Sequence, residues 1–320
     1  MRFPALSTLA ASALVAAATS NAPACSVCGC SLSSDWGLQD YHESPGFTLG
    51  LRYEYFEQDQ LRSGPKAVDL HAYTLPADQE LQVSTTNRNT ILQFDDVLNR
   101  HWAVSVQLPH HDRDHRTIAE DTTEVSSSRA RGLGDARVLA RYRLQGTLAH
   151  SWILQCGLKL PTGRFDQDFA TGPVAGERLD RGLQLGTGTT DALAGVAWFG
   201  RPASHWGLFA QALLDQPLSE REGFAPAASL TVSGGVRWLN AGSITPQLQL
   251  NVRTEGRERG VNSDPDNSGG TVALLSPGLS AQLAARISAY AFVQFPLYQR
   301  WNGLQLQPRT LLIAGLDCRW

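Results

Sequence analysis

Hydrophobic and polar residues alternate with a period of two along most of the chain after about residue 46. Between Phe47 and Tyr55, aromatic and leucine residues occupy every second position, with Thr, Gly, Arg and Glu between them. Successive side chains of a β-strand point to opposite faces, so this spacing predicts strands with one apolar and one polar face. The pattern predicts twelve strands, at residues 47–56, 86–98, 102–109, 133–144, 151–160, 188–199, 206–215, 228–239, 243–253, 271–283, 286–297 and 309–320.

The connections between these strands alternate between short and long. The long ones include residues 57–85, 110–132, 161–187 and 254–270. A soluble β-sandwich also has two-faced strands, but it has no reason to sort its loops in this way. A transmembrane barrel does, because its periplasmic turns are tight and its outer loops are long. The sequence therefore predicts an all-β, transmembrane, antiparallel up-and-down β-barrel of about twelve strands over residues 47–320, with both termini in the periplasm.

The first 24 residues have the features of an export signal. Arg2 supplies a positive charge, residues 6–18 form a short apolar stretch, and Ala22-Pro23-Ala24 is a cleavage site before Cys25. Residues 1–24 are predicted to be a signal peptide and residues 25–46 a periplasmic N-terminal segment. The last strand ends on the aromatic residue Trp320, which is similar to the C-terminal signal of outer-membrane proteins. We therefore expect a bacterial outer-membrane location, with barrel-assembly machinery and outer-membrane lipid as partners.

Composition excludes several classes of protein. The net charge of -3 shows no basic excess, so nucleic acid is not an expected partner. Hydrophobic residues make up 42% of the chain, yet no apolar run after residue 20 approaches the roughly 20 residues that a spanning helix needs. No catalytic triad, carboxylate pair or phosphate loop stands out, so the chain is not expected to be an enzyme.

Charged residues in the predicted strands fall on the polar face. On the lipid side, a basic residue near the middle of the membrane would cost roughly 2–4 kcal/mol. These charges are therefore predicted to line the lumen, where they either fill and rigidify it or select the solute. They are Arg52, Glu54, Asp135, Arg137, Arg141, Arg143, Lys159, Asp191, Arg237, Arg253, Asp317 and Arg319.

Three glycine-rich motifs lie at strand ends: Gly132-Leu-Gly-Asp135, Gly157-Leu-Lys-Leu-Pro-Thr-Gly163 and Gly186-Thr-Gly-Thr-Thr-Asp191. With them, residues 45–320 resemble the outer-membrane barrel family named for the meta-pathway of phenol degradation. The resemblance implies a channel or transporter for small organic solutes and implies no catalytic residues. Asp135 and Asp191 are expected to meet lumen arginines.

Three cysteines occur within six residues at the predicted mature N-terminus: Cys25, Cys28 and Cys30. Thiolates at this spacing can converge on Cu(I) or Zn(II). A disulfide formed in the periplasm, or lipidation of Cys25, are the alternatives. Two further cysteines, Cys156 and Cys318, fall on the predicted lipid face and are expected to serve as small apolar residues.

Other candidate features lie in loops and at strand ends. His110, His111, Asp112 and His115 begin a predicted outer loop and are candidate Zn(II) or Cu(II) ligands. Asp264, Asp266 and Asn267 are weak candidates for Ca²⁺ binding, since they lack the calcium-loop pattern. Aromatic residues near strand ends are predicted to form interfacial girdles: Trp102, Tyr142, Trp152, Trp198, Trp206, Trp238, Tyr298, Trp301 and Trp320.

Three functional hypotheses follow. The first is an outer-membrane channel for small solutes, including aromatic or hydrophobic ones. The second is a metal or redox module that the barrel anchors in the periplasm through the N-terminal cysteines. The third is a structural barrel or surface adhesin.

Overall fold

The computed structural model describes residues 45–69, 80–119, 123–144, 150–239 and 242–320. Within these ranges, regular structure consists of thirteen strands and one three-residue 3-10 helix, η2 (Arg181–Leu183). No helix in the described residues is long and apolar enough to cross a membrane.

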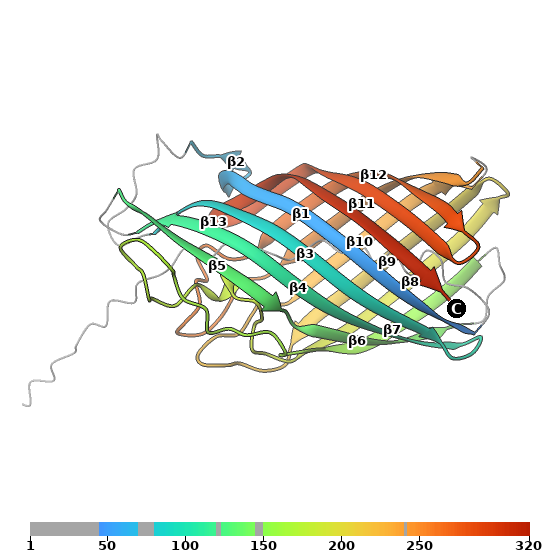
Figure 1. The fold of residues 1–320 in the computed structure, drawn as a ribbon, viewed down its shortest axis with the longest axis horizontal. Helices are drawn as coiled ribbons and strands as arrows, with labels where there is room; N and C mark the ends of the chain where they lie inside the picture. Colours follow the sequence, from blue (N-terminus) through green and yellow to red (C-terminus); the bar gives the residue numbers. More distant parts are fainter. Residues whose placement is uncertain (1–44, 70–79, 120–122, 145–149, 240–241) are drawn as a thin grey trace, which may run out of the picture.

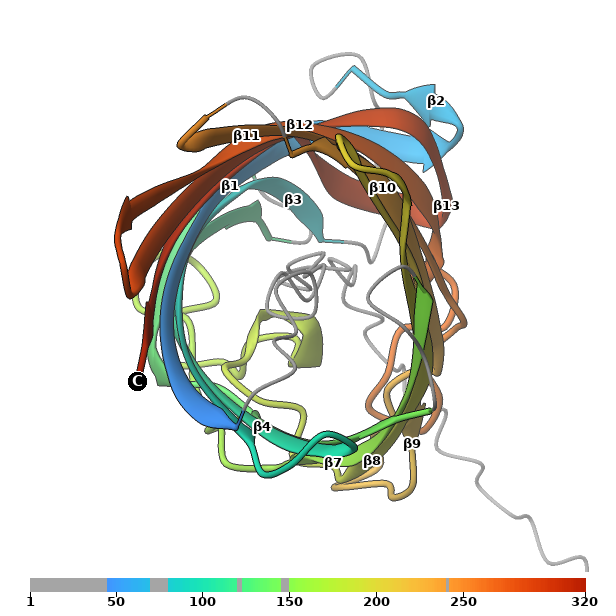
Figure 2. The same cartoon turned by 90° about the vertical axis from the view of Figure 1, so that its right-hand side faces the viewer.

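Eleven of the strands close into a ring (Figures 1 and 2). Neighbouring strands are antiparallel, and β13 pairs with β1 to complete the ring, with Leu51 opposite Leu316. Closure leaves no open sheet edge in the wall, which is the condition for a sheet to sit in lipid. The ring strands are β1 (Gly46–Gly64), β3 (Leu81–Val97), β4 (Trp102–Ile118), β6 (Ala136–Arg143), β7 (His150–Leu160), β8 (Asp191–Ala203), β9 (Trp206–Pro217), β10 (Ser229–Trp238), β11 (Ile244–Glu255), β12 (Gly270–Ala284) and β13 (Ile287–Arg319).

β13 crosses the wall twice because it folds back at Gly303. Residues 287–301 pair with β12, whereas residues 301–319 pair with β1. The Arg319 N–H donates to the Arg286 carbonyl at 2.9 Å, so the two ends of β13 lie side by side. Gly303 has a φ of 53°, which glycine adopts without a steric penalty. The described wall therefore has twelve antiparallel passes, and the predicted all-β barrel of about twelve strands is confirmed.

The period-two pattern separates the inner face of the wall from the outer face. In β1, Arg52 and Glu54 are 5% and 2% exposed, whereas Leu51 and Tyr53 between them are 48% and 44% exposed. Large apolar side chains therefore cover the outside, where a transmembrane barrel meets lipid. Cys156 and Cys318 lie among them as free thiols.

Most of the predicted girdle residues lie on the outer face, several of them in pairs. The Trp102 and Tyr142 rings are 4.8 Å apart between centroids, and those of Trp206 and Trp238 are 5.3 Å apart. The prediction is wrong for Trp301, which is 7% exposed and packs on the inside of the barrel. The backbone irregularity between Ala273 and Leu274 in the β12–β13 pairing changes which residues face inward.

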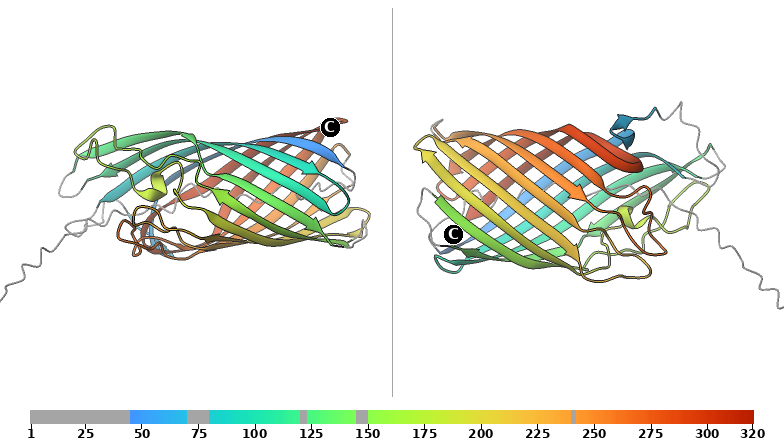
Figure 3. Two further views of the ribbon diagram at one scale, coloured as in Figure 1. Left: turned by 90° about the horizontal axis from the view of Figure 1, so that it is seen from below. Right: turned by 180° about the vertical axis from the view of Figure 1, so that it is seen from behind.

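The two ends of the barrel differ, as Figures 1 and 3 show. At one end the connections are short, for example from β3 to β4 and from β8 to β9. The C-terminus lies at this end, where Trp320 and Phe47 exchange backbone hydrogen bonds of 2.8 and 3.2 Å. Longer loops gather at the opposite end, where β2 (Lys66–Ala67) and β5 (Val125–Leu133) lie beside the ring.

The predicted loop at 110–132 is wrong, because most of it is strand. β4 continues to Ile118 and pairs with β5, so the sheet extends beyond the apolar band. On the outer face of this extension Arg129 binds Asp112 through bonds of 3.0 and 2.8 Å. Without an apolar stripe, this stretch resembled a loop in the sequence. β1 and β3 also extend further than predicted, to Gly64 and from Leu81.

Candidate solute path and its mouth

The structure places the twelve predicted lumen charges on inward positions of the wall or at its long-loop end. Seven of them are less than 10% exposed: Arg52, Glu54, Asp135, Arg141, Arg143, Lys159 and Asp191. The others lie an even number of positions from buried residues of the same strand, so they are on the same face, and they are half-buried: Arg137, Arg237, Arg253, Asp317 and Arg319.

Many of these charges form ion pairs with each other or with acids that the sequence analysis missed. Arg52 Nε lies 2.9 Å from Glu54 Oε1. Arg141 pairs with Asp95 at 2.8 Å, Arg137 with Asp215 at 3.3 Å, and Arg253 with Glu255 at 3.0 Å. Asp95 and Asp215 lie on the polar face of their predicted strands, so the two-residue alternation alone could have identified them. Glu255 lies beyond the predicted end of its strand.

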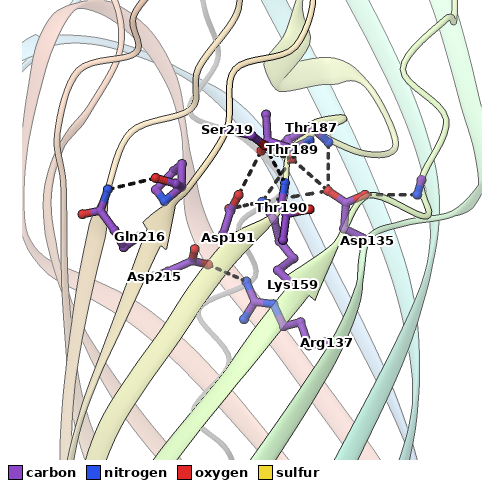
Figure 4. Close-up of polar contacts among 12 residues, drawn as sticks. Asp135, Arg137, Lys159, Thr187, Thr189, Thr190, Asp191, Asp215, Gln216 and Ser219 are labelled. Atoms are coloured by element: carbon purple, nitrogen blue, oxygen red, sulfur yellow. Dashed lines mark hydrogen bonds and ion pairs between the residues drawn. The ribbon is translucent and has the colours of Figure 1, made fainter.

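A cluster at the long-loop end joins the three glycine-rich motifs (Figure 4). We call Asp135, Lys159, Thr187, Thr189 and Asp191 the clamp. Asp135 Oδ1 accepts from the Gly163 N–H at 3.0 Å, and its Oδ2 accepts from the Thr187 N–H at 2.9 Å and hydroxyl at 3.0 Å. Motifs that are far apart in the chain therefore form one site.

Lys159 is the cation of the clamp. Its Nζ forms an ion pair with Asp191, lies 3.9 Å from Asp135 Oδ2 and donates to Thr187 Oγ1 at 3.1 Å. Thr189 completes the clamp by donating to Asp191 Oδ1 at 2.9 Å. The expectation that Asp135 and Asp191 meet arginines is wrong, because the cation at both is this lysine.

The clamp holds residues 161–190, which we call the mouth loop. Figure 2 shows this yellow-green segment, with η2, inside the ring when the barrel is viewed end-on. Arg113 Nη1, from the inner face of β4, donates to the carbonyls of Gly182 at 2.9 Å and Gln184 at 3.2 Å. Residues 161–187 were expected to form an outer loop, but part of this segment folds into the barrel opening.

The mouth loop has its own packed interior. Its apolar residues pack with one another and with Ala130 of β5: Phe169, Leu179, Leu183 and Leu185. The Gln184 side chain accepts from the Gln167 N–H and donates to the carbonyls of Gln167 and Leu179, each at 2.9 Å. The loop therefore has a defined conformation and narrows the long-loop end.

Asp180 precedes η2 and is 9% exposed. Burial raises the pKa of this carboxyl well above its usual value, and the negative charges of Glu80, Asp264 and Glu258 raise it further. Its Oδ2 has no hydrogen-bond donor among the described residues. The neutral acid is therefore the form that fits this position.

An apolar surface lies on the inner face of β12, β13 and β1. We call it the apolar arc. Its main cluster consists of Phe56, Val272, Leu274, Trp301 and Leu311, with exposures from 0% to 7%. Phe292 and Ile313 pack together further along β13. The inner wall therefore carries several ion pairs on β6 to β9 and its main apolar cluster on β12, β13 and β1, although Arg52–Glu54 on β1 is an ion pair and Ile153 and Ala197 on β7 and β8 are apolar.

The structure does not bring the candidate histidines together. His111 and His115 face inward and bind Asn89 Oδ1 and Thr85 Oγ1 at 2.7 and 2.8 Å, whereas His110 has the opposite parity in β4. Asp264 accepts from the Asn267 backbone and side chain within its own loop. Across the described ranges, no three His, Cys, Asp or Glu residues form a group that could hold a metal ion. Cys25, Cys28 and Cys30 lie outside the described residues, and their copper or zinc site stays a prediction.

Comparison with known proteins supports the fold. No family model and no curated protein sequence matches the chain. Among solved structures, the COG4313 outer membrane channel from Pseudomonas putida F1 is similar, with a TM-score of 0.62 and 15% identity. The match covers 88% of this chain and 98% of that one. The NanC porin is more distant, with a TM-score of 0.45, 10% identity, and coverage of 84% of this chain and 98% of the porin. The chain thus has the fold of outer-membrane β-barrels.

Proposed function

We propose that the protein is an outer-membrane channel for small solutes that contain an apolar or aromatic part. The apolar arc is the observation that carries this proposal. The interior of a water-filled porin is polar, so a cluster of large apolar side chains on the inner wall favours a less polar solute.

The charged side of the wall supports the same proposal. Its acids and bases largely neutralise one another in ion pairs, so they offer little net charge to a passing ion. A barrel of this size lies between eight-stranded barrels filled by side chains and open sixteen-stranded porins. With the mouth loop folded inward, we expect low conductance for hydrated ions.

The orientation of the barrel in the membrane follows from the difference between its long-loop end and its short-turn end. In outer-membrane barrels the long loops lie outside the cell and the short turns face the periplasm. The mouth loop would then meet the solute first, and both termini of the barrel would lie in the periplasm. The predicted signal peptide agrees with this export route.

Uptake of N-phenyl-1-naphthylamine tests the proposal. This dye fluoresces in apolar surroundings, and an intact outer membrane excludes it. Cells expressing the wild type should take it up faster than cells expressing Leu274→Gln, which places an amide in the apolar arc. A heat-modifiability gel must show equal amounts of folded barrel. If cells with the folded wild-type barrel take up the dye no faster than cells that lack the barrel, the proposal is wrong.

A further inference from the structure

Two arginines and two phenylalanines meet at the long-loop end, outside the clamp. Arg181 Cζ lies 4.4 Å from the centroid of the Phe165 ring and 5.4 Å from that of Phe224. Arg221 Cζ lies 5.9 Å from the Phe165 centroid. Phe224 is 2% exposed and Phe165 is half-buried. We call these four residues the Arg–Phe cluster.

Gly188 allows the cluster to form. A Cβ atom at this position would lie 2.9 Å from Phe165 Cε1 and 3.2 Å from Arg221 Cγ. Its φ of 73° also favours glycine. Gly188 sits between Thr187 and Thr189, so the cluster lies directly against the clamp and beside the entrance to the barrel.

A strained turn positions Arg221. Glu222 and Gly223 have φ values of 51° and 67°, and Glu222 is the only non-glycine residue with positive φ in the described chain. Such a conformation persists only where the surroundings hold it. Here Asn262 does so, because its Nδ2 donates to the Glu222 carbonyl at 2.8 Å and its backbone N–H donates to the Gly223 carbonyl at 2.9 Å.

Arg181 ties this turn to the mouth loop. Its Nη2 donates to the Arg221 carbonyl at 3.1 Å and to Glu222 Oε2 at 3.2 Å. Three loops therefore meet at the cluster. One contains Arg181, the second contains Arg221 and the third contains Asn262. An arrangement that depends on three loops and a strained residue is a built surface rather than a chance contact.

The cluster has one cation without a matching anion. Arg178 pairs with Asp168 at 3.0 Å and Arg181 pairs with Glu222. The Arg221 guanidinium is exposed and has no carboxylate partner within the described ranges. Burial lowers the pKa of Arg181, and the nearby positive charges of Arg178 and Arg221 lower it further, against the effect of Glu222. Arg221 is therefore the guanidinium of the cluster that an added carboxylate could pair with.

We propose that the Arg–Phe cluster is a binding site for an aromatic carboxylate at the entrance of the channel. The planar guanidinium of Arg221 matches a carboxylate through two parallel hydrogen bonds. The Phe165 ring beside it offers an apolar surface on which an aromatic ring can stack. This site deepens the proposed channel function, on which it rests, by naming one class of solute that the entrance collects.

Calorimetric titration of the folded, detergent-purified barrel tests the site with three probes. Benzoate carries both the ring and the charge, benzyl alcohol only the ring, and acetate only the charge. We expect benzoate to bind more tightly than the other two. Arg221→Gln should weaken benzoate binding about tenfold, because a charge-assisted pair is lost, and should leave benzyl alcohol unchanged. Phe165→Leu should reduce the preference for benzoate over acetate.

The matched control is Arg201→Gln, an exposed arginine near the short-turn end of β8, which should bind benzoate like the wild type. Equal binding of benzoate to the wild type and Arg221→Gln overturns the site, as does acetate binding as tightly as benzoate. Dye entry and benzoate titration of the wild-type barrel together separate the two proposals. A wild-type barrel that admits dye but shows no preference for benzoate refutes only the site, and a wild-type barrel that binds benzoate but admits no dye refutes only the channel.

Discussion

The inner wall of the barrel has two sides that are built from the same kind of antiparallel strands but carry different kinds of side chain. On β6 to β9, several inward residues are charged and pair with one another or with the mouth loop, as Lys159 does with Asp135 and Asp191. On β12, β13 and β1, the inward residues include the large apolar ones of the arc, such as Leu274 and Trp301, beside polar ones such as Gln294. The charged side is held by its own ion pairs, whereas the apolar arc is held by packing of large side chains and leaves Trp301 Nε1 without a hydrogen-bond acceptor in the described residues. The comparison indicates that lumen charges are not by themselves evidence of ion selectivity.

The two sides also differ in what a substitution should change. Removing one member of a buried ion pair leaves the other charge without compensation, so the cost falls on stability. The side chains of the apolar arc are also buried, so a polar replacement there costs stability as well, and in addition it makes the inner wall more polar, which should slow an apolar solute.

The largest effect is expected at Lys159. Lys159→Met leaves Asp135 and Asp191 without their cation, which should cost about 3–5 kcal/mol of stability. Urea unfolding in lipid vesicles, followed by tryptophan fluorescence, measures this loss. Lys66→Met, at the exposed and only other lysine of the chain, is the control. A loss below about 1 kcal/mol would show that the clamp is not a compensated charge cluster.

Asp135→Asn should release the mouth loop. The variant keeps one acceptor oxygen in place of a carboxylate that holds the backbone of Gly163 and Thr187. Bonds to a charged group contribute about 1.5–3 kcal/mol each. We expect higher single-channel conductance and faster proteolysis within residues 161–190. Asp166→Asn, exposed on the same loop, should change neither. If conductance and proteolysis of Asp135→Asn equal those of the wild type, Asp135 does not hold the mouth loop.

Leu274→Gln should slow the entry of apolar dye, because it places an amide in the packed apolar cluster and makes the inner wall less favourable for an apolar solute. Leu193→Gln is matched in residue type and burial but lies on the charged side, in β8. It should affect dye entry less. Equal slowing by both variants would remove the distinction between the two sides.

The packing of the mouth loop should weaken as pH rises. Because the pKa of Asp180 is higher in the folded loop than in an unfolded chain, its contribution is fully present below the unfolded pKa of about 3.8. It is lost as pH rises through the folded value. Hydrogen exchange at the Leu183 amide, corrected for intrinsic rates, should therefore show less protection at higher pH. Asp180→Asn should remove this dependence, and a dependence that survives would assign it to another group.

The smallest effect is expected outside the lumen. Arg88 pairs with Asp114 at 2.6 Å on the outer face of the extension, with both side chains more than a third exposed. Arg88→Gln should lower stability by only about 0.2–1 kcal/mol in the same urea experiment. An effect as large as that of Lys159→Met would show that exposure does not separate the two groups of ion pairs.

Much of the wall was predictable because strand alternation is a local property. Two-residue periodicity distinguished Arg52 from Leu51 without knowledge of any partner. The same logic failed where the outer face is polar, as at Asp112 and Arg129, because the criterion depended on an apolar stripe. It also failed at Trp301, where a backbone irregularity changes the side of the wall.

The candidate site was less predictable. The glycine-rich motifs marked Asp135 and Asp191, but local spacing could not choose Lys159 over an arginine as their cation. The Arg–Phe cluster was missed because Phe165, Arg181 and Arg221 come from separate loops and share no periodic pattern.

The sequence by itself determined which face of each strand would be apolar, because strand alternation depends on neighbouring residues, and the sorting of short turns and long loops indicated a barrel. Tertiary structure alone decided which inward charges meet, that the mouth loop enters the barrel, and where the apolar arc lies. Those features depend on strand register and loop path, which bring together residues as distant as Asp135 and Thr187. No short stretch of sequence contains that information.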